Sequence, residues 1–201
     1  MSPEAPSSRF RLAAIQDHAS PAWKSFYPED LPSDWVLAYY AHFWRELLVP
    51  AHAWQTWLED RRWLDEAPEG LRLYFQVPDG CGNEGLELAS RFGARLGGLL
   101  FPDAAADVPA QVQPSRVFRR MPDPVFADVR CALAFACGQA TVLVLDPETG
   151  LDPRQWRGLL EAVHAATASA RDALVFLRTG PDELDQAQTI LRLSGLAWRQ
   201  D

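Results

Sequence analysis

Lysine is almost absent from this chain, and the acidic side chains outnumber the basic ones. Lys24 is the only lysine among 19 basic residues, which face 27 acidic residues and leave a net charge of −8. A protein that binds long nucleic acids needs a surplus of basic side chains to neutralise phosphates. The charge balance therefore argues against a large nucleic-acid surface. Because arginine supplies every other basic side chain, the one retained lysine, Lys24, is a candidate functional residue.

The chain also lacks the sequence features of membrane, secreted and nucleotide-dependent proteins. No apolar run is long enough to cross a bilayer, and residues 1–8 (MSPEAPSS) have neither the basic nor the apolar region of a signal peptide. We expect residues 1–8 to be a disordered tail and the protein to be cytoplasmic. Cys81, Cys131 and Cys137 fit no zinc or redox spacing. No glycine-rich phosphate motif follows a predicted strand, so no cofactor is expected.

Predicted strands and helices alternate through the rest of the chain, which should form a single α/β domain over residues 9–201. Alternation of this kind is typical of parallel βαβ units. Eight such units would make a TIM barrel, whose length begins near ~200 residues. We count about seven strands and therefore predict an incomplete TIM-barrel-like fold, with a doubly wound open sheet as the alternative. The predicted strands are residues 10–15, 46–49, 71–77, 96–101, 116–119, 141–145 and 174–177. The predicted helices include residues 52–64, 84–94, 123–136 and 153–168.

Four short motifs stand in the first half of the chain. They are residues 23–28 (WKSFYP), 39–41 (YYA), 68–71 (PEGL) and 96–101 (LGGLLF). In these motifs the chain resembles the YecE-like family, TIM-barrel-like proteins catalogued as domain of unknown function number seventy-two. The resemblance is good over residues 11–101 and thin afterwards. It implies a barrel whose chemistry lies at the C-terminal ends of the strands.

The departures from the family pattern fall at those strand ends. The resemblance places a carboxylate of the second strand at Leu48, an amide at Pro50 and an acid of the fifth strand at Val117. The family's loop after the first strand falls on residues 14–18, and no strand with its Arg-x-His-Gly signature follows Asp146. The resemblance therefore implies a degenerate ancestral site and a gap in the barrel wall. Such a gap exposes unpaired strand edges, which loops or another subunit must cover.

The remaining polar residues suggest two kinds of site. Lys24 and Arg119 could bind a small anion such as a phosphate or carboxylate, with Trp23 and Tyr27 beside Lys24. The weaker alternative is a metal site of mixed nitrogen and oxygen ligands, formed by Asp17, His18, His52 and Asp146. Their spacing is not specific, and scattered residues of these types often cap helices or face water.

The sequence makes no positive case for catalysis. No serine lies in a nucleophile elbow, and no cysteine has an evident activating partner. Six of the eight tryptophans fall within the first 63 residues, where their helical spacing suits core packing better than stacking on sugars or bases. We therefore expect a non-enzymatic binding or assembly protein that forms homo-oligomers or binds a protein partner. The alternative is an anion-binding barrel or a metal-assisted phosphoesterase with a rebuilt site.

Overall fold

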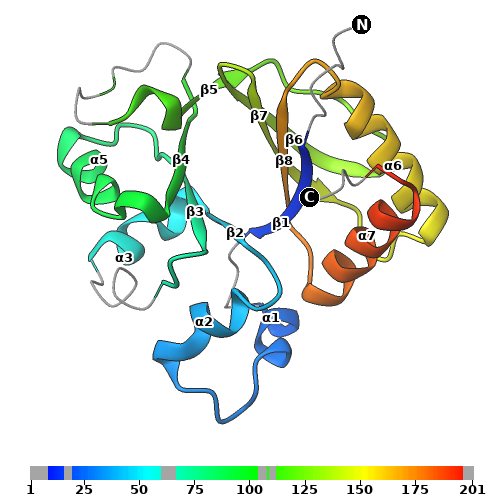
Figure 1. Ribbon diagram of the computed structural model, residues 1–201, viewed down its shortest axis with the longest axis horizontal. Coiled ribbons are helices and arrows are strands. Elements are labelled where there is room, and N and C mark those ends of the chain that lie inside the picture. Colours follow the sequence, from blue (N-terminus) through cyan, green and yellow to red (C-terminus); the bar gives the residue numbers. More distant parts are fainter. Residues whose placement is uncertain (1–8, 16–19, 60–66, 104–107, 109–111, 197–201) are drawn as a thin grey trace, which may run out of the picture. The chain divides into compact units, whose positions relative to one another are not determined.

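The strands lie in the sheet in the order in which they occur along the chain (Figure 1). The computed structural model describes residues 9–15, 20–59, 67–103, 108 and 112–196. Its strands are β1 (Arg9–Ile15), β2 (Glu46–Val49), β3 (Arg72–Gln76), β4 (Leu96–Phe101), β5 (Val117–Met121), β6 (Val129–Cys137), β7 (Ala140–Pro147) and β8 (Asp172–Leu177). Its α-helices are α1 (Pro21–Phe26), α2 (Val36–Tyr40), α3 (Trp54–Glu59), α5 (Asn83–Ser90), α6 (Pro153–Ala166) and α7 (Pro181–Leu193). Short 3-10 helices are η1 (Ser33–Trp35), η2 (Ala51–Ala53), η3 (Gly93–Arg95) and η4 (Pro114–Arg116). The predicted mixed α/β class is confirmed.

The prediction that the barrel is incomplete was wrong, whereas the predicted parallel pairing holds for most strands. The strand order β1 to β8 closes into a barrel. The additional strand is β6, where a helix over residues 123–136 was predicted, and β6 runs antiparallel to β7. As expected, β7 is followed directly by a helix, α6. In the described part of the chain no further strand follows Asp146 before α6, as predicted, and the strand that brings the barrel to eight is β6, which precedes β7.

A tight hairpin explains why β6 is a strand. Cys137 pairs with Ala140, so only Gly138 and Gln139 form the turn, and Gly138 has a φ of +57°. Two-residue hairpin turns need positive φ values, which glycine adopts at no steric cost. Alternate residues of β6 are alanines, and alanine has the highest helix propensity. The ladder to the β-branched and leucine-rich β7 overrides that local preference.

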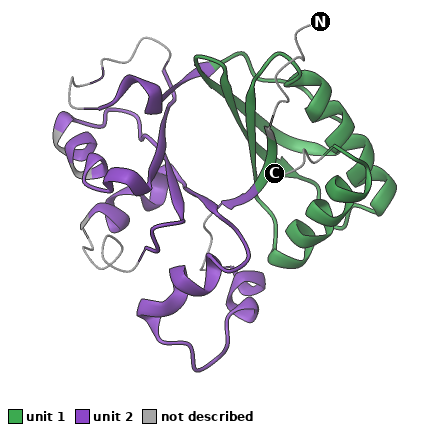
Figure 2. Ribbon diagram, viewed as in Figure 1, with its two compact units in different colours: residues 1–12, 121–201 green, residues 13–120 purple. Residues whose placement is uncertain are grey.

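The chain divides into two compact units, which are described separately (Figure 2). One unit comprises residues 1–12 and 121–201, and the other comprises residues 13–120. The expected single domain over residues 9–201 stays a prediction, and the expected tail, residues 1–8, lies outside the described residues. No helix in the described parts of the chain is long and apolar enough to span a membrane.

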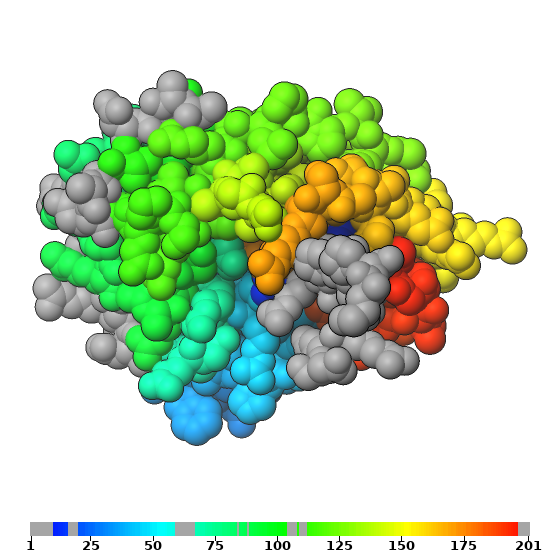
Figure 3. All heavy atoms as spheres, turned by 45° about the horizontal axis from the view of Figure 1, so that its top comes forward, coloured from blue at the N-terminus to red at the C-terminus, as the bar shows by residue number. Residues whose placement is uncertain are grey.

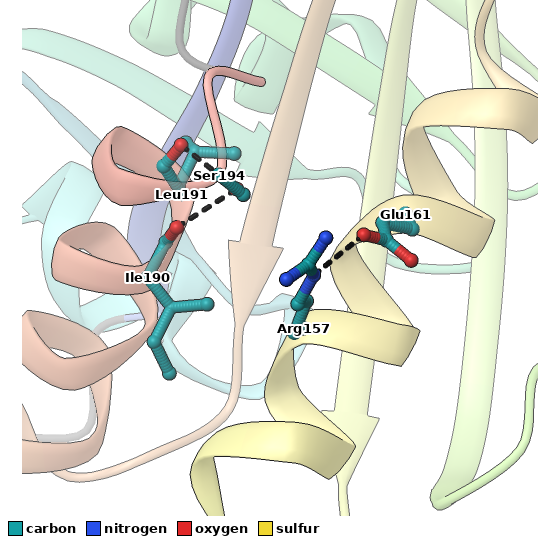
Figure 4. A network of polar contacts seen from close by, with 5 residues as sticks. All are labelled: Arg157, Glu161, Ile190, Leu191 and Ser194. Atoms are coloured by element: carbon teal, nitrogen blue, oxygen red, sulfur yellow. Dashed lines mark hydrogen bonds and ion pairs between the residues drawn. The ribbon is translucent and has the colours of Figure 1, made fainter.

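In the unit of residues 1–12 and 121–201, α6 and α7 contact each other and pack against the sheet. Helix α6 begins with a capping box, in which Asp152 accepts hydrogen bonds from the backbone N–H groups of Arg154 and Gln155. Its exposed face carries the Arg157–Glu161 ion pair at 2.7 Å, and Ser194 closes the end of α7 through the carbonyls of Ile190 and Leu191 (Figure 4). Local capping signals thus define both helices.

In the unit of residues 13–120, the strands β1 to β5 pair in parallel. Phe75 of β3 packs edge-on against Trp54 and Trp57 of α3, with ring centroids 5.8 and 6.3 Å apart, and lies 5.1 Å from Phe92. The face of the sheet that carries Phe75 is therefore the face covered by α3 and by the turn between α5 and η3. Tyr74 lies on the opposite face, because successive side chains alternate across a strand.

Candidate functional site

The predicted anion-binding residues Trp23, Lys24 and Tyr27 lie on or next to α1. This helix begins at Ser20, whose hydroxyl accepts a hydrogen bond from the backbone N–H of Trp23 at 3.3 Å. Trp23 is buried, Lys24 is exposed and Tyr27 is half-buried. The indole of Trp23 is therefore part of the packing beneath α1, and only the Lys24 side chain reaches water freely.

Arg119, the fourth predicted anion ligand, lies on β5. Arg119 pairs in register with Phe101 of β4. Two residues earlier on β4, Leu99 pairs in register with Phe75 of β3. Residues in register share a face of a sheet, so the register places Arg119 on the face that the helices cover and Arg120 on the other face. Arg119 is half-buried there. Joint anion binding by Lys24 and Arg119 stays a prediction.

The predicted metal ligands are dispersed over the chain. Asp17 and His18 lie outside the described residues, and His52 is exposed in η2. Asp146, in the other unit, accepts a hydrogen bond from the Arg130 guanidinium at 2.6 Å. Among the residues that the structure describes, no group of three histidine, cysteine or acidic side chains could hold a metal ion.

The strand-end positions that the family resemblance marked as replaced are buried and apolar. Leu48 is fully buried between Ile15 and Tyr74, its neighbours in register. Pro50 and Val117 are buried as well. The side chains at these positions contribute packing, and they offer no group that could transfer a proton or bind a metal.

The densest concentration of special side chains is an aromatic cluster on α1, α2 and the turn after α2. Neighbouring rings have centroids 5.0–6.5 Å apart, most of them tilted or edge to face. Aromatic pairs in such arrangements stabilise one another by ~0.5–1.5 kcal/mol beyond the area that they bury. The aromatic cluster consists of Trp23, Phe26, Tyr27, Tyr39, Tyr40, Phe43 and Trp44.

The base of the aromatic cluster is fixed by a buried hydrogen bond. Tyr40 is completely buried, and its hydroxyl donates to the carbonyl oxygen of Glu46 at 2.7 Å. Burial raises the pKa of Tyr40 well above its usual value, and burial followed by the neighbouring Tyr39 raises the pKa of Tyr27. Both phenols are therefore neutral at physiological pH, and the cluster rests on a rigid uncharged base.

One side of the aromatic cluster is exposed to water. Trp35, Tyr39 and Phe43 are four residues apart, so they share one side of the helical turns from η1 through α2. Trp35 is 61% exposed and Phe43 is 54% exposed, whereas Tyr39 is half-buried. We name these three residues the aromatic ridge. The atoms of this segment lie at the surface in the space-filling view (Figure 3).

Sequence reasoning missed the aromatic ridge because it assigned the early tryptophans to the core. That assignment is confirmed for Trp23, Trp44, Trp54 and Trp57, which are buried, and wrong for Trp35. The spacing of positions 35, 39 and 43 was visible in the sequence. The burial of the surrounding rings was not, because it depends on how α1 packs against α2.

Acidic side chains flank the aromatic ridge in sequence. Glu29 and Asp30 lie between α1 and η1, and Asp34 lies in η1 next to Trp35. All three are exposed. We name them the acidic rim. Between Ser20 and Trp44 the only lysine or arginine is Lys24, so this segment has more acidic than basic side chains, and Arg45 follows it directly.

Comparisons with known proteins find similarity in fold at low identity. No protein-family model and no curated protein matches the chain. A DUF72 family protein from Thermotoga maritima MSB8 matches with a TM-score of 0.48 and 14% identity, covering 92% of this chain and 99% of that protein. A DUF72 family protein from Enterococcus faecalis V583 matches with a TM-score of 0.43 and 11% identity, covering 95% and 99%. Similarity at this level assigns neither a family nor a function, and membership of the YecE-like family stays a prediction.

Proposed function

We propose that this protein is a non-enzymatic binding protein and that the aromatic ridge is its recognition surface. The observation that carries this proposal is the exposure of two large rings, Phe43 at the edge of the aromatic cluster and Trp35 one helical turn before Tyr39. Large rings are enriched where proteins bind one another, and contiguous exposed apolar surface marks interaction sites.

The size of the exposed surface is sufficient for recognition. A tryptophan and a phenylalanine of these exposures leave roughly 250 Å² of largely apolar surface in water. Covering that surface would contribute about 6 kcal/mol before the entropic costs of association. A few large rings of this kind commonly supply most of the affinity of an interface.

The packing beneath the aromatic ridge supports the same role. Phe26 lies edge-on to Tyr39 and Phe43, at 5.3 and 5.1 Å between ring centroids, and Tyr39 lies 5.5 Å from Phe43. These contacts restrict the rotamers of two of the three ridge rings. A surface that is already ordered loses less conformational entropy on binding, which strengthens association.

The strand-end positions support a role without catalysis. Leu48, Pro50 and Val117 are buried and apolar, and such side chains cannot act as acids, bases or nucleophiles. If the family resemblance is correct, the ancestral site is degenerate at these positions. A binding surface elsewhere on the chain then accounts for the function better than a rebuilt catalytic site does.

The test is the dependence of an identified partner on the aromatic ridge. Proteins captured from an extract of the source cells by the wild-type protein would be identified and purified, and their dissociation constants would be measured by calorimetry. The double variant Trp35→Ala/Phe43→Ala should weaken binding at least tenfold, whereas Val125→Ala, an equally apolar change at a 95% exposed position, should not. Equal binding by all three proteins, or measurable turnover of a substrate, would overturn the proposal.

A further inference from the structure

We infer that the aromatic ridge binds an arginine-bearing, positively charged segment of a partner protein. This inference rests on the proposed binding function and specifies the chemistry of the partner. It is carried by two features of residues 20–44, the exposed rings of Trp35 and Phe43 and the exposed carboxylates of the acidic rim.

The ring faces suit a planar cation. Tyr39 and Phe43 are tilted by 48° to each other, and Phe26 stands at 67° and 72° to them. Phe43 is 54% exposed in this arrangement, so part of its π surface is open to water. A guanidinium is planar and weakly hydrated, and it stacks on such faces through cation–π attraction. Successive ridge residues are four positions apart, a rise of ~6 Å along an α-helix, which is close to the ~6.6 Å between alternate residues of an extended peptide.

The acidic rim provides charge complementarity. No hydrogen bond or ion pair within the described part of the chain engages the carboxylates of Glu29, Asp30 or Asp34. Over residues 20–44 they set three negative charges against the single ammonium of Lys24, and the exposed Arg45 follows directly. Carboxylates can accept two parallel hydrogen bonds from one guanidinium. A partner with several arginines can therefore stack on the rings and pair with the rim together.

The same charges argue against other occupants. An anionic partner would meet the acidic rim and a chain of net charge −8. A second copy of this chain would bring its own rim to the same place, since the two surfaces of an isologous dimer are identical. Like charges across an interface oppose association. A basic segment avoids both penalties.

A peptide titration tests this inference with the intact protein. The probe is a short fluorescein-labelled peptide that alternates arginine with glycine, and matched peptides carry lysine or neutral citrulline in place of arginine. Binding is followed by fluorescence anisotropy at a fixed, moderate ionic strength. We expect the arginine peptide to bind most tightly, the lysine peptide several-fold more weakly, and the citrulline peptide least.

The variants separate the contribution of the rings from that of the charges. Trp35→Ala/Phe43→Ala should weaken binding of the arginine peptide roughly tenfold, because each exposed cation–π contact contributes about threefold in affinity. Glu29→Gln/Asp34→Asn should weaken the arginine and lysine peptides alike and reduce the salt dependence. Val125→Ala should change neither. Circular dichroism and the melting temperature confirm that each variant is folded, and Trp35→Gln/Phe43→Gln gives a second test if the alanine variant is not.

Each outcome decides the inference. Equal affinity for arginine and lysine peptides, with no effect of the ring variants, shows nonspecific charge attraction and overturns it. Concentration-dependent dimerisation that the ring variants abolish would show that the occupant is a second copy, and this also overturns it. If an identified partner depends on the aromatic ridge while the arginine peptide does not, the proposed function stands and only the basic partner is wrong. If neither depends on the aromatic ridge, both fail.

Discussion

Replacing Gly98 with alanine should destabilise the unit that contains β4, although the change adds a single methyl group. Gly98 is buried and pairs in register with Tyr74. A Cβ atom at this position would lie 2.6 Å from Cε2 and 2.7 Å from Cδ2 of Phe118, and 3.2 Å from Cδ1 of Tyr74. The first two distances are far below normal van der Waals contact, so the Phe118 ring or the strand must move.

The magnitude follows from two opposing effects. Overpacking of a dense core typically costs about 1–3 kcal/mol. Alanine is favoured over glycine inside a helix or strand by about 0.5–1 kcal/mol, because an unfolded chain with alanine has less conformational entropy to lose on folding. We therefore expect the free energy of unfolding to fall by roughly 1–2 kcal/mol, which corresponds to a melting temperature lower by about 2–8 °C for a chain of this size.

Gly158 provides the matched control, because the same substitution there should have the opposite sign. A Cβ at Gly158, on the exposed face of α6, would meet no atom within 4 Å. Gly158→Ala should therefore raise the free energy of unfolding by about 0.5–1 kcal/mol. Urea denaturation followed by circular dichroism measures both variants. A Gly98→Ala protein as stable as the wild type would refute the packing argument.

A double substitution locates the strain at the Phe118 ring. Phe118→Leu removes Cε2, the ring carbon nearest to the new methyl group, and leaves a δ carbon that can rotate away, at the cost of lost packing against Tyr74, whose ring centroid lies 6.2 Å away. The destabilisation of Gly98→Ala/Phe118→Leu should be smaller than the sum of the single effects by more than ~0.5 kcal/mol. Simple additivity would place the strain elsewhere.

Four further predictions concern a cap, a buried phenol, the pH dependence of stability and the single lysine. Asp152→Ala, which removes the capping box of α6, should lower the free energy of unfolding by about 1 kcal/mol, and an unchanged urea midpoint would contradict it. Tyr40→Phe should lower it by ~1–3 kcal/mol, because the Glu46 carbonyl loses its donor. The pKa values of Tyr27 and Tyr40 are raised in the folded protein. Above the usual tyrosine pKa of 10.0 the unfolded chain therefore binds fewer protons than the native one. The free energy of unfolding should fall as the pH rises above that value. An ultraviolet titration in which every tyrosine ionises in the folded protein near that pH would contradict this prediction. The anion-binding alternative predicts that inorganic phosphate raises the melting temperature of the wild type and not of Lys24→Ala, and an equal rise in both would exclude Lys24 as a ligand.

Helix ends and most strands could be predicted from the sequence because their determinants are local. In the last helix Pro181 stands at the first position and Gly195 follows the end, and α7 accordingly spans Pro181–Leu193, with Gly195 at a φ of +71°. The capping residue Asp152 lies directly before the predicted helix that begins at Pro153. Proline, first-turn acids and a positive-φ glycine act within one or two turns, so the sequence suffices.

The candidate site could be predicted only in part. The motif that contains Trp23, Lys24 and Tyr27 was correctly singled out, and it lies in or beside the aromatic cluster. The expected role was different, since Trp23 is buried beneath the surface that Trp35 and Phe43 form. A helical spacing of aromatic residues indicates that they share a side, but it does not indicate whether that side faces the core or water.

By itself, the sequence determined the α/β class, the positions of most strands, the caps of α6 and α7, and the acidic balance of the surface. Tertiary structure alone decided that Val129–Cys137 is a strand, because an alanine-rich segment becomes one only when β7 supplies a ladder of hydrogen bonds. It likewise decided that Phe26 packs against Tyr39 and Phe43 while Trp35 stays in water. Local signals act through neighbours in the chain, whereas strand pairing and burial depend on residues that only folding brings together.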